Sequence, residues 1–179
     1  FSYDTVNSTN IVAKELAQKG AAEGTVVVAE QQGTGRGRLE RSFFSPYGKG
    51  IWVSIILRPA FLPQDAPKCT LLAAVAVAHA MERFGLRAEI KWPNDILHDG
   101  RKLVGILTEM SAEVDRVNYV VIGIGINVNI AMEDFPEELR SVATSLMQMK
   151  GEPLPRVAFL QELLRSLDAL YADVTREGF

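Results

Sequence analysis

Asp99 and Gly100 lie between two apolar stretches, and this pair is the clearest signal for a fold in the sequence. Asp-Gly suits the tight turn of a β-hairpin, because both residue types tolerate the positive φ angles that such a turn requires. Residues 95–112 are therefore predicted to form a hairpin. Runs rich in β-branched residues predict further strands along the chain. These strands span residues 24–30, 50–59, 88–93 and 117–129.

Apolar residues with helical spacing occur near both ends of the chain and once in its middle. The predicted helices span residues 8–19 and 67–84, short helices within 136–149, and a last helix from Pro155 onward. Because hairpins dominate the strands, the pattern predicts an α+β fold in which helices cover one face of a mixed or largely antiparallel sheet. A length of 179 residues suits one domain, which we expect to span residues 1–179.

The composition limits the partners of the chain as a whole. The formal net charge is -3, so no overall positive field draws the protein to nucleic acid or to a membrane, and any anion site must be local. The single cysteine, Cys69, excludes an intramolecular disulfide and a cysteine metal cluster, and it is compatible with the reducing cytoplasm. No apolar run is long enough to cross a bilayer. Because the chain starts at Phe1 without a methionine, we expect it to be part of a longer polypeptide.

Local positive charge is concentrated in the loop predicted between residues 33 and 49, where Arg36, Arg38 and Arg41 alternate with glycines and other residues. Glycines let backbone N–H groups approach a ligand closely, and arginine forks suit phosphate or carboxylate. The loop is neither a Walker loop nor a Rossmann fingerprint, because no Gly-Lys-Ser/Thr follows and the next element is a strand. Taken alone, the loop has three possible interpretations: an anion-binding loop, a mobile solvated loop, or an RGG-like segment that binds nucleic acid.

A second polar cluster, Lys91, Asn94, Asp95 and Lys102, lies around the predicted hairpin. If Lys91 and Asp95 flank the turn after a strand, both side chains can point into one cleft. The alternatives are that a lysine beside an aspartate forms a structural ion pair, and that Lys102, close to a turn, is simply solvated.

Two further groups of residues suggest ligand contact. Ser8, Thr9 and Asn10 are all good N-cap residues, and since one cap is enough, the others leave donors and acceptors for a small polar ligand. Gly123 and Gly125 interrupt an apolar strand, which often marks close approach by a ligand or another backbone. The alternative for the first group is an ordinary helix cap. The alternative for the second is that Asn127, at the end of the strand, simply forms a turn.

In this order, the segments NSTN, AEQQGTGRGRLERSF, KWPNDIL, GRKLVGILTE and GIGINVN resemble the catalytic domain of the biotin protein ligases, also called biotin–[acetyl-CoA-carboxylase] ligases. The resemblance runs from Tyr3 to about Leu146. It implies a fold related to the class II aminoacyl-tRNA synthetases and a cytoplasmic enzyme with a two-step reaction. Biotin and ATP first give biotinyl-5′-AMP and pyrophosphate. The biotinyl group then passes to one lysine of a biotin carboxyl carrier protein.

The resemblance also implies roles for residues at the matching positions. Ser8, Thr9 and Asn10 are expected at the ureido end of biotin. Gln32 is assigned to biotin in preference to its neighbour Gln31. The complete implied biotin site is Ser8, Thr9, Asn10, Gln32, Gly35, Arg36, Gly37, Arg38, Lys102, Gly105, Gly123 and Gly125.

The implied ATP site consists of Arg41, Phe43, Lys91, Asn94 and Asn127. Mg²⁺ would be held through the ATP phosphates, with Asn127 as a candidate ligand. Phe43 stands where the family usually has a tryptophan that packs on adenine, and it keeps an aromatic face but lacks the indole N–H. The implied catalytic residues are Arg38, Lys102 and Asp95.

The residue types suit this chemistry in their own right. The carboxylate of biotin is ionised at pH 7, so the difficulty is to bring one anion close to another. Arg38, Lys102 and Mg²⁺ can offset that repulsion and stabilise the transition state. In the second step the acceptor lysine must be neutral, and a carboxylate such as Asp95 can serve as its base or anchor. The glycines would let the arginine loop open and then close over the labile adenylate.

Three other functions compete with this interpretation. A lipoate or octanoate protein ligase shares the fold and a central lysine. A non-catalytic biotin-sensing protein would bind biotin without turnover, although Arg38, Lys102 and Asp95 argue against a dead site. An RNA-binding module is disfavoured by the net charge and by the lack of an aromatic-basic stripe.

Domains that the family often carries are not expected in these residues. We expect residues 1–179 to contain neither the helix-turn-helix of the repressor forms nor the small β-barrel that usually follows the catalytic domain. We therefore expect no DNA binding by this chain and no membrane partner. Exposed edge strands are compatible with a homodimer.

Overall fold

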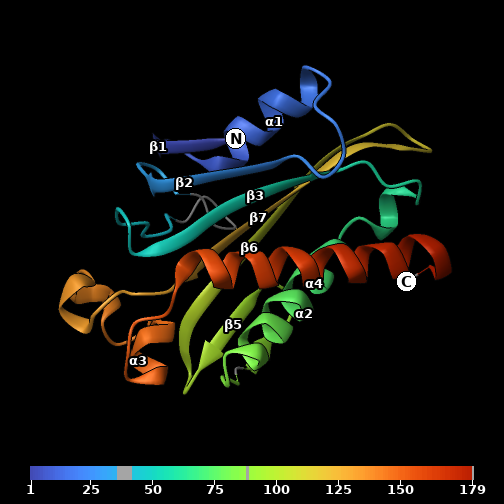
Figure 1. Cartoon of the computed structure of the whole chain (residues 1–179). Coiled ribbons are helices and arrows are strands. Elements are labelled where there is room, and N and C mark those ends of the chain that lie inside the picture. Colours follow the sequence, from blue (N-terminus) through green and yellow to red (C-terminus); the bar gives the residue numbers. More distant parts are fainter. Residues whose placement is uncertain (36–41, 88, 179) are drawn as a thin grey trace.

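The computed structural model describes residues 1–35, 42–87 and 89–178, and within these ranges seven strands form one sheet in the order β1-β2-β3-β7-β6-β5-β4 (Figure 1). The strands are β1 Ser2–Val6, β2 Val26–Gln32, β3 Gly50–Leu57, β4 Glu89–Lys91, β5 Asp95–His98, β6 Arg101–Ala112 and β7 Val117–Asn127. Only the β1–β2 pair is parallel among these neighbours. The predicted α+β class with a mixed, largely antiparallel sheet is confirmed.

The hairpin predicted from Asp99 and Gly100 is confirmed, and it joins β5 to β6. Asp99 has φ 49° and Gly100 has φ 74°, which is the left-handed pair that a two-residue turn demands. Strand β1 was not predicted from the sequence. This strand is a five-residue edge strand whose residues are mostly exposed, so it lacks the apolar run that marks the other strands.

The predicted helices are present with boundaries that differ by a few residues. They are α1 Thr9–Gln18, α2 Lys68–Arg83, α3 Leu146–Lys150 and α4 Arg156–Glu177, with 3₁₀ turns at Pro63–Asp65, Met132–Asp134 and Glu137–Leu139. Pro155 is the N-cap residue of α4, where its missing N–H costs no helical hydrogen bond. Ser145 caps α3 by accepting a hydrogen bond from the backbone N–H of Gln148.

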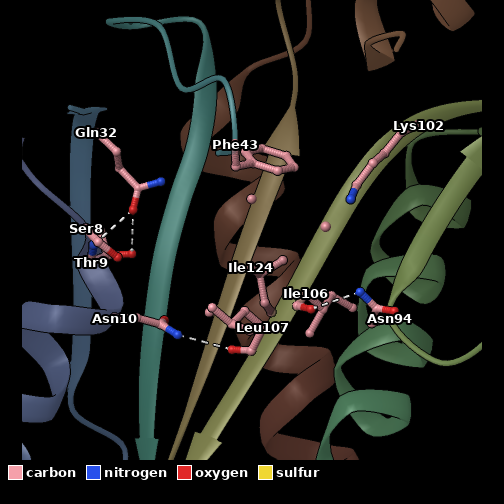
Figure 2. Close-up of a pocket in the computed structure, with 13 residues that line it drawn as sticks. Ser8, Thr9, Asn10, Gln32, Phe43, Asn94, Lys102, Ile106, Leu107 and Ile124 are labelled. Atoms are coloured by element: carbon pink, nitrogen blue, oxygen red, sulfur yellow. Dashed lines mark hydrogen bonds between the residues drawn. The ribbon is translucent and has the colours of Figure 1, made fainter. Parts of the chain in front are cut away.

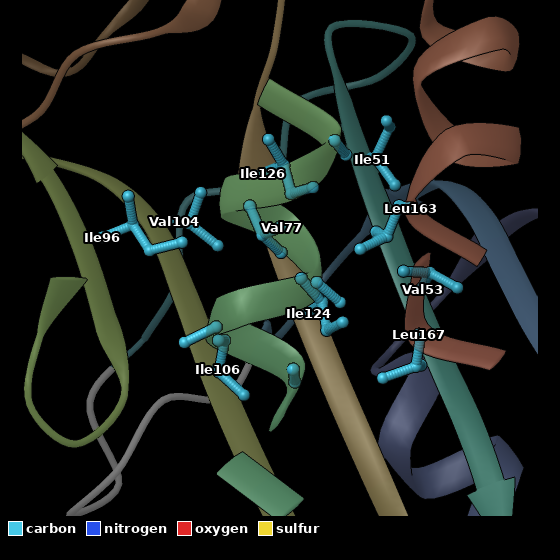
Figure 3. Packing of buried hydrophobic residues seen from close by; sticks show 14 of the residues in the cluster. Ile51, Val53, Val77, Ile96, Val104, Ile106, Ile124, Ile126, Leu163 and Leu167 are labelled. Atoms are coloured by element: carbon cyan, nitrogen blue, oxygen red, sulfur yellow. The ribbon is translucent and has the colours of Figure 1, made fainter. Parts of the chain in front are cut away.

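Helices α2 and α4 lie side by side on one face of the sheet and bury the main core (Figures 1 and 3). Val77 of α2 and Leu163 of α4 pack against the central strands. On the sheet side, alternate residues such as Val53 and Ile124 point into this layer, as the two-residue period of a strand requires. Burial of these side chains is the main force that holds the layers together.

The expectation that helices cover one face of the sheet is wrong in part, because α1 covers the opposite face. Ala13 and Ala17 of α1 form a second buried cluster with Val27 and Ile56. Ile55, next to Ile56 in β3, belongs to the main core instead. All of β3 is therefore buried, on both faces, which explains why its sequence is continuously apolar and does not alternate. Among the described residues, no helix is long and apolar enough to span a membrane.

Candidate functional site

A pocket opens on the α1 face of the sheet, between the start of α1 and strands β7 and β6 (Figure 2). One wall consists of polar side chains, the floor is rich in glycine, and a lysine stands at the far side. The lining residues are Ser8, Thr9, Asn10, Gln32, Phe43, Asn94, Lys102, Gly105, Ile106, Leu107, Gly123, Ile124 and Gly125. The structure therefore brings together residues from all five segments that carry the resemblance, and Gln32 and Phe43 represent the segment that contains the arginine loop.

The polar wall is held together by the side chain of Gln32. Its Oε1 accepts a hydrogen bond from the backbone N–H of Thr9 at 2.9 Å and lies 3.2 Å from the Thr9 hydroxyl oxygen. Its Nε2 donates to Ser45 Oγ at 3.0 Å, and Ser45 in turn donates to the carbonyl of Phe43. This series of hydrogen bonds orients the Gln32 amide. It links β2 both to the first turn of α1 and to the segment that carries Phe43.

A second set of hydrogen bonds lies deeper, around Asn10. Its Nδ2 donates to the carbonyl of Leu107 at 3.2 Å and to Glu109 Oε2 at 2.9 Å. Its Oδ1 lies 2.6 Å from the hydroxyl of Ser54, which is fully buried and also lies 2.8 Å from Thr9 Oγ1. Buried polar groups in a pocket wall are stable only when paired in this way.

The glycines of the floor leave space for the side chains of Asn10 and Phe43. A Cβ placed on Gly123 would collide with Asn10 Oδ1, and one on Gly105 or Gly125 would lie 2.8 Å from the ring of Phe43. Gly105, Gly123 and Gly125 line the pocket, and their expected contact with biotin stays a prediction. The close approach predicted at Gly123 and Gly125 is made by side chains, and Phe43 lies over the floor as Figure 2 shows.

The cationic side of the pocket is Lys102, whose Nζ lies 3.0 Å from Asp95 Oδ1. The same ammonium group lies 5.5 Å from the centroid of the Phe43 ring, a cation–π arrangement. Asn94 donates from Nδ2 to Asp95 Oδ1 at 3.2 Å, so the carboxylate is held from two sides. The lysine is half-buried and lies beside the pocket, which excludes the alternative of a solvated side chain near a turn.

Other predicted site residues lie outside the pocket lining. Lys91 is exposed in β4, directly opposite Asp95 in the strand register, and the ion pair of Asp95 is with Lys102. Asn127 is 4% exposed, and its Nδ2 donates to the carbonyl of Thr144. The carbonyl of Gly35 accepts from the backbone N–H of Phe43 at 2.7 Å. Arg36, Gly37, Arg38 and Arg41 lie outside the described residues, so their roles stay predictions.

Several residues of the site were missed by the sequence analysis. Ser54 is a single serine within an otherwise apolar buried strand, and such an isolated polar residue is a usable signal. Glu109 and Lys14 form an ion pair behind Asn10, but their separation along the chain leaves no local pattern. Ile106 and Ile124 are apolar neighbours of the floor glycines, which periodicity alone places only in a strand.

No cluster of three or more His, Cys, Asp or Glu side chains that could hold a metal ion occurs in residues 1–35, 42–87 and 89–178. Asp95 lies beside the lining residue Lys102 and already pairs with it, and the described lining residues include no carboxylate. The described residues therefore offer too few ligands to coordinate a metal ion by themselves. Such a donor set suits a magnesium ion that arrives on nucleotide phosphates and keeps several of its waters.

Comparisons with known proteins agree with this geometry. A protein-family model described as the biotin/lipoate A/B protein ligase family matches residues 2–127. The "Bifunctional ligase/repressor BirA" of Bacillus spizizenii is 52% identical over 177 residues, covering 98% of this chain and 54% of that protein. The "Biotin--[acetyl-CoA-carboxylase] ligase" of Mycobacterium tuberculosis is 34% identical over 168 residues, covering 90% of this chain and 60% of that protein.

A solved structure of the biotin protein ligase from Aquifex aeolicus in complex with biotin and ATP has a TM-score of 0.84 and is 28% identical, covering 99% of this chain and 72% of that one. The chain spans about half the length of the BirA proteins that it matches. The fold, the pocket and the extent of the family match together lead to one conclusion. This chain belongs to the biotin/lipoate A/B protein ligase family.

Proposed function

We propose that this chain is the catalytic part of a biotin protein ligase. It would activate biotin with ATP to biotinyl-5′-AMP and transfer the biotinyl group to a lysine of a carrier protein. The observation that carries the proposal is the polarity of the pocket: neutral hydrogen-bonding groups on one side and the Lys102 ammonium on the other. Biotin has the same division, with a neutral cyclic urea at one end and a carboxylate at the other.

The urea end of biotin offers two N–H donors and one carbonyl acceptor. Ser8, Thr9 and Gln32 supply hydroxyl and amide groups that can pair with all three. The apolar part of the bicycle would lie on the glycine floor, against Ile106 and Ile124. Apolar walls with a few placed polar groups are typical of small-molecule sites.

At the other end, Lys102 would hold the biotin carboxylate and reduce its repulsion with the α-phosphate of ATP. A carboxylate oxygen attacks the α-phosphorus, the bond from that phosphorus to the bridging oxygen breaks, and pyrophosphate leaves. Because the carboxylate is already ionised, this step needs no base. Lys102 would contribute charge stabilisation and positioning, and together these two effects supply much of the rate enhancement in many enzymes.

The nucleotide would lie on the side of Phe43 and Asn94, both of which line the pocket. Arg41, Lys91 and Asn127 stay predicted contacts of ATP, and Arg36, Gly37 and Arg38 stay predicted contacts of biotin and the adenylate. Mg²⁺, when bound on the phosphates, would neutralise charge on the leaving pyrophosphate. The residues of this chain then need only to orient the two substrates and keep water away.

In the second step, the amine of a carrier lysine attacks the acyl carbon, the acyl–phosphate bond breaks, and AMP leaves. The attacking amine must lose a proton, and Asp95, which lies beside Lys102, would accept it. The acceptor that we propose is a biotin carboxyl carrier protein. One relative bears the name of an acetyl-CoA-carboxylase ligase, which supports that choice.

The setting of the reaction is also part of the proposal. We place the protein in the cytoplasm, where ATP and reduced thiols occur together. Two relatives carry names that combine ligase with repressor. That the residues of this chain bind no DNA therefore stays a prediction, which a gel-shift measurement can test. A homodimer through an exposed sheet edge is a separate prediction, which sedimentation can test.

The experiment that tests the proposal is an adenylate assay by mass spectrometry. The chain is incubated with biotin, lipoate, ATP and Mg²⁺ together. We expect biotinyl-5′-AMP and no lipoyl-AMP, with a loss of roughly 10²–10³ in rate for Lys102→Ala. Arg165→Ala, an exposed site on α4, serves as the control variant and should be unchanged.

Two results would overturn the proposal. Formation of lipoyl-AMP in place of the biotin product would assign the chain to the lipoate branch of the family. If neither adenylate forms while calorimetry shows biotin binding, the chain is a biotin-binding protein and not a complete ligase.

A further inference from the structure

An ion pair lies directly behind the polar wall of the pocket. Lys14 Nζ in α1 lies 2.6 Å from Glu109 Oε1 in β6, and the two side chains are 29% and 28% exposed. Lys14 and Asn10 are one helical turn apart, so both face the same strand. Glu109 therefore contacts both, with Oε1 toward Lys14 and Oε2 at 2.9 Å from Asn10 Nδ2.

The ion pair determines which end of the Asn10 amide points in each direction. The carboxylate of Glu109 and the carbonyl of Leu107 can only accept hydrogen bonds, so the NH₂ group must face them. The opposite end is then an oxygen, and it lies 2.6 Å from Ser54 Oγ. Because that oxygen carries no hydrogen, the single proton of Ser54 must be directed to it.

This orientation reaches the pocket through Thr9. Ser54 has no second proton for Thr9, so Thr9 must donate at the 2.8 Å contact between their hydroxyl oxygens. This contact is shorter than the 3.2 Å from Thr9 Oγ1 to Gln32 Oε1, and that oxygen already accepts from the Thr9 backbone N–H. The lone pairs of Thr9 Oγ1 are then available as acceptors. In the opposite orientation of Asn10, the NH₂ group would donate to Ser54, Ser54 would donate to Thr9, and Thr9 would turn its own proton away from Ser54.

We propose that the Lys14–Glu109 ion pair is a positioning element that sets the donor and acceptor pattern of this wall and so selects ligands with a urea or similar N–H donors. The inference rests on the proposed function only in naming biotin as that ligand. Lys14 and Glu109 act through Asn10, Ser54 and Thr9, and they do not line the pocket. Lys14 holds the carboxylate in place, and Glu109 holds the amide.

The test compares Glu109→Gln and Lys14→Met with the unaltered chain in biotin calorimetry. A glutamine at position 109 can offer either an acceptor or a donor to Asn10, so the amide is no longer restricted to one orientation. We expect biotin and desthiobiotin, which share the urea, to bind roughly ten- to a hundredfold more weakly. Lipoate, which has no urea, should change by less than about twofold. In turnover, the KM for biotin should rise while kcat and the KM for ATP stay unchanged, because the urea is remote from the reacting carboxylate.

Matched controls separate this effect from general damage. Glu113→Gln removes a glutamate just beyond the same strand that also pairs at 2.6 Å, with Arg116, and it should leave biotin binding unchanged. Lys14→Arg, which keeps the charge, should restore most of the affinity that Lys14→Met loses. A variant that weakens biotin and lipoate equally, or changes kcat alone, would overturn the inference, because a merely structural role predicts such a loss.

A readout without ligand makes the inference independent of the proposed function. The side-chain amide resonances of Asn10, assigned with Asn10→Asp, should shift in ¹⁵N NMR spectra of Glu109→Gln and Lys14→Met but not of Glu113→Gln. Unchanged resonances would overturn the inference even if biotin binds. If the resonances shift but the unaltered chain binds no biotin, the positioning role holds and the proposed function fails.

Discussion

Lys102 Nζ lies 3.0 Å from Asp95 Oδ1, across the hairpin that joins β5 and β6. The lysine that would hold the substrate carboxylate is therefore paired, before any ligand arrives, with a carboxylate of the protein. Asn94 and the Phe43 ring complete its surroundings. A substrate carboxylate must share this ammonium group with Asp95, and this arrangement places two of the three candidate catalytic groups side by side.

The roles of Asp95 and Lys102 are expected to separate in the two half-reactions. Asp95→Asn removes the competing charge, so adenylate formation should stay within about tenfold of the unaltered chain. Transfer to an acceptor lysine should fall by roughly 10²–10⁴, because the base is lost. Single-turnover assays that follow adenylate and biotinylated acceptor separately measure this. Asp99→Asn, in the exposed turn of the same hairpin, is the control. Equal losses in both steps would mean that Asp95 only positions Lys102.

Gly125 is expected to be intolerant of any side chain. A Cβ there would lie 2.8 Å from Phe43 Cε1, so Gly125→Ala must displace the ring that covers the floor. Overpacking of this kind costs about 1–3 kcal/mol, and we expect a comparable loss in biotin affinity. Calorimetry of Gly125→Ala, alone and with Phe43→Ala, tests the cause, since removal of the ring should relieve part of the loss. Gly33→Ala is the control, because its Cβ would meet Asn7 Oδ1 at an ordinary 3.7 Å.

Arg58 is expected to contribute strongly to stability. Its guanidinium donates to the carbonyls of Ala17, Ala21 and Asn118 at 2.8–3.0 Å, which satisfies the C-terminal end of α1. Arg58→Ala should lower the free energy of unfolding by about 2–4 kcal/mol, as expected for lost hydrogen bonds to a charged group. Urea unfolding measures this.

The comparison variant for Arg58 is Arg165→Ala. Arg165 pairs with Glu162 at 3.5 Å on the exposed side of α4, so its loss should change the unfolding free energy by less than about 0.5 kcal/mol. If the two variants are equally stable, the carbonyls at the end of α1 are satisfied by water and Arg58 is dispensable.

Stability is expected to fall at alkaline pH. Burial raises the pKa of the Cys69 thiol from 9.0 to about 12, and burial together with the hydrogen bond to Glu23 raises the pKa of Tyr171. Both groups keep their protons in the folded state longer than in the unfolded state. Their contribution to the free energy of unfolding is therefore fully present below pH 9 and is lost as pH rises from 9 towards 12. For Cys69 alone, the free energy of unfolding should fall by about 1.4 kcal/mol per pH unit in this range.

Urea unfolding at pH 8, 9.5 and 10.5 measures this slope. Cys69→Ala should flatten it between pH 9 and 10.5, and Tyr171→Phe should flatten its upper part. A stability that is independent of pH in this window, or a slope that both variants leave intact, would contradict the assignment.

Much of the fold follows from patterns that are local in the sequence. The Asp99–Gly100 turn, the apolar strands and the Pro155 start of α4 depend on backbone preferences and on two- or four-residue spacings, which neighbours along the chain establish. The edge strand β1 was not predicted, because an exposed strand needs no apolar run. The covering of the second sheet face by α1 was missed, although the continuously apolar sequence of β3 is the pattern expected for a strand buried on both faces.

Short motifs with fixed spacing were enough to predict most of the secondary structure, the family and most of the pocket-lining residues. Which side chains meet one another depends on the folded arrangement. Asn10 contacts Glu109 although 99 positions separate them, and Phe43 covers Gly105 and Gly125 only in the folded sheet. Such contacts depend on strand register and on the packing of α1, and a separation of this size leaves no periodic trace that a sequence pattern can carry.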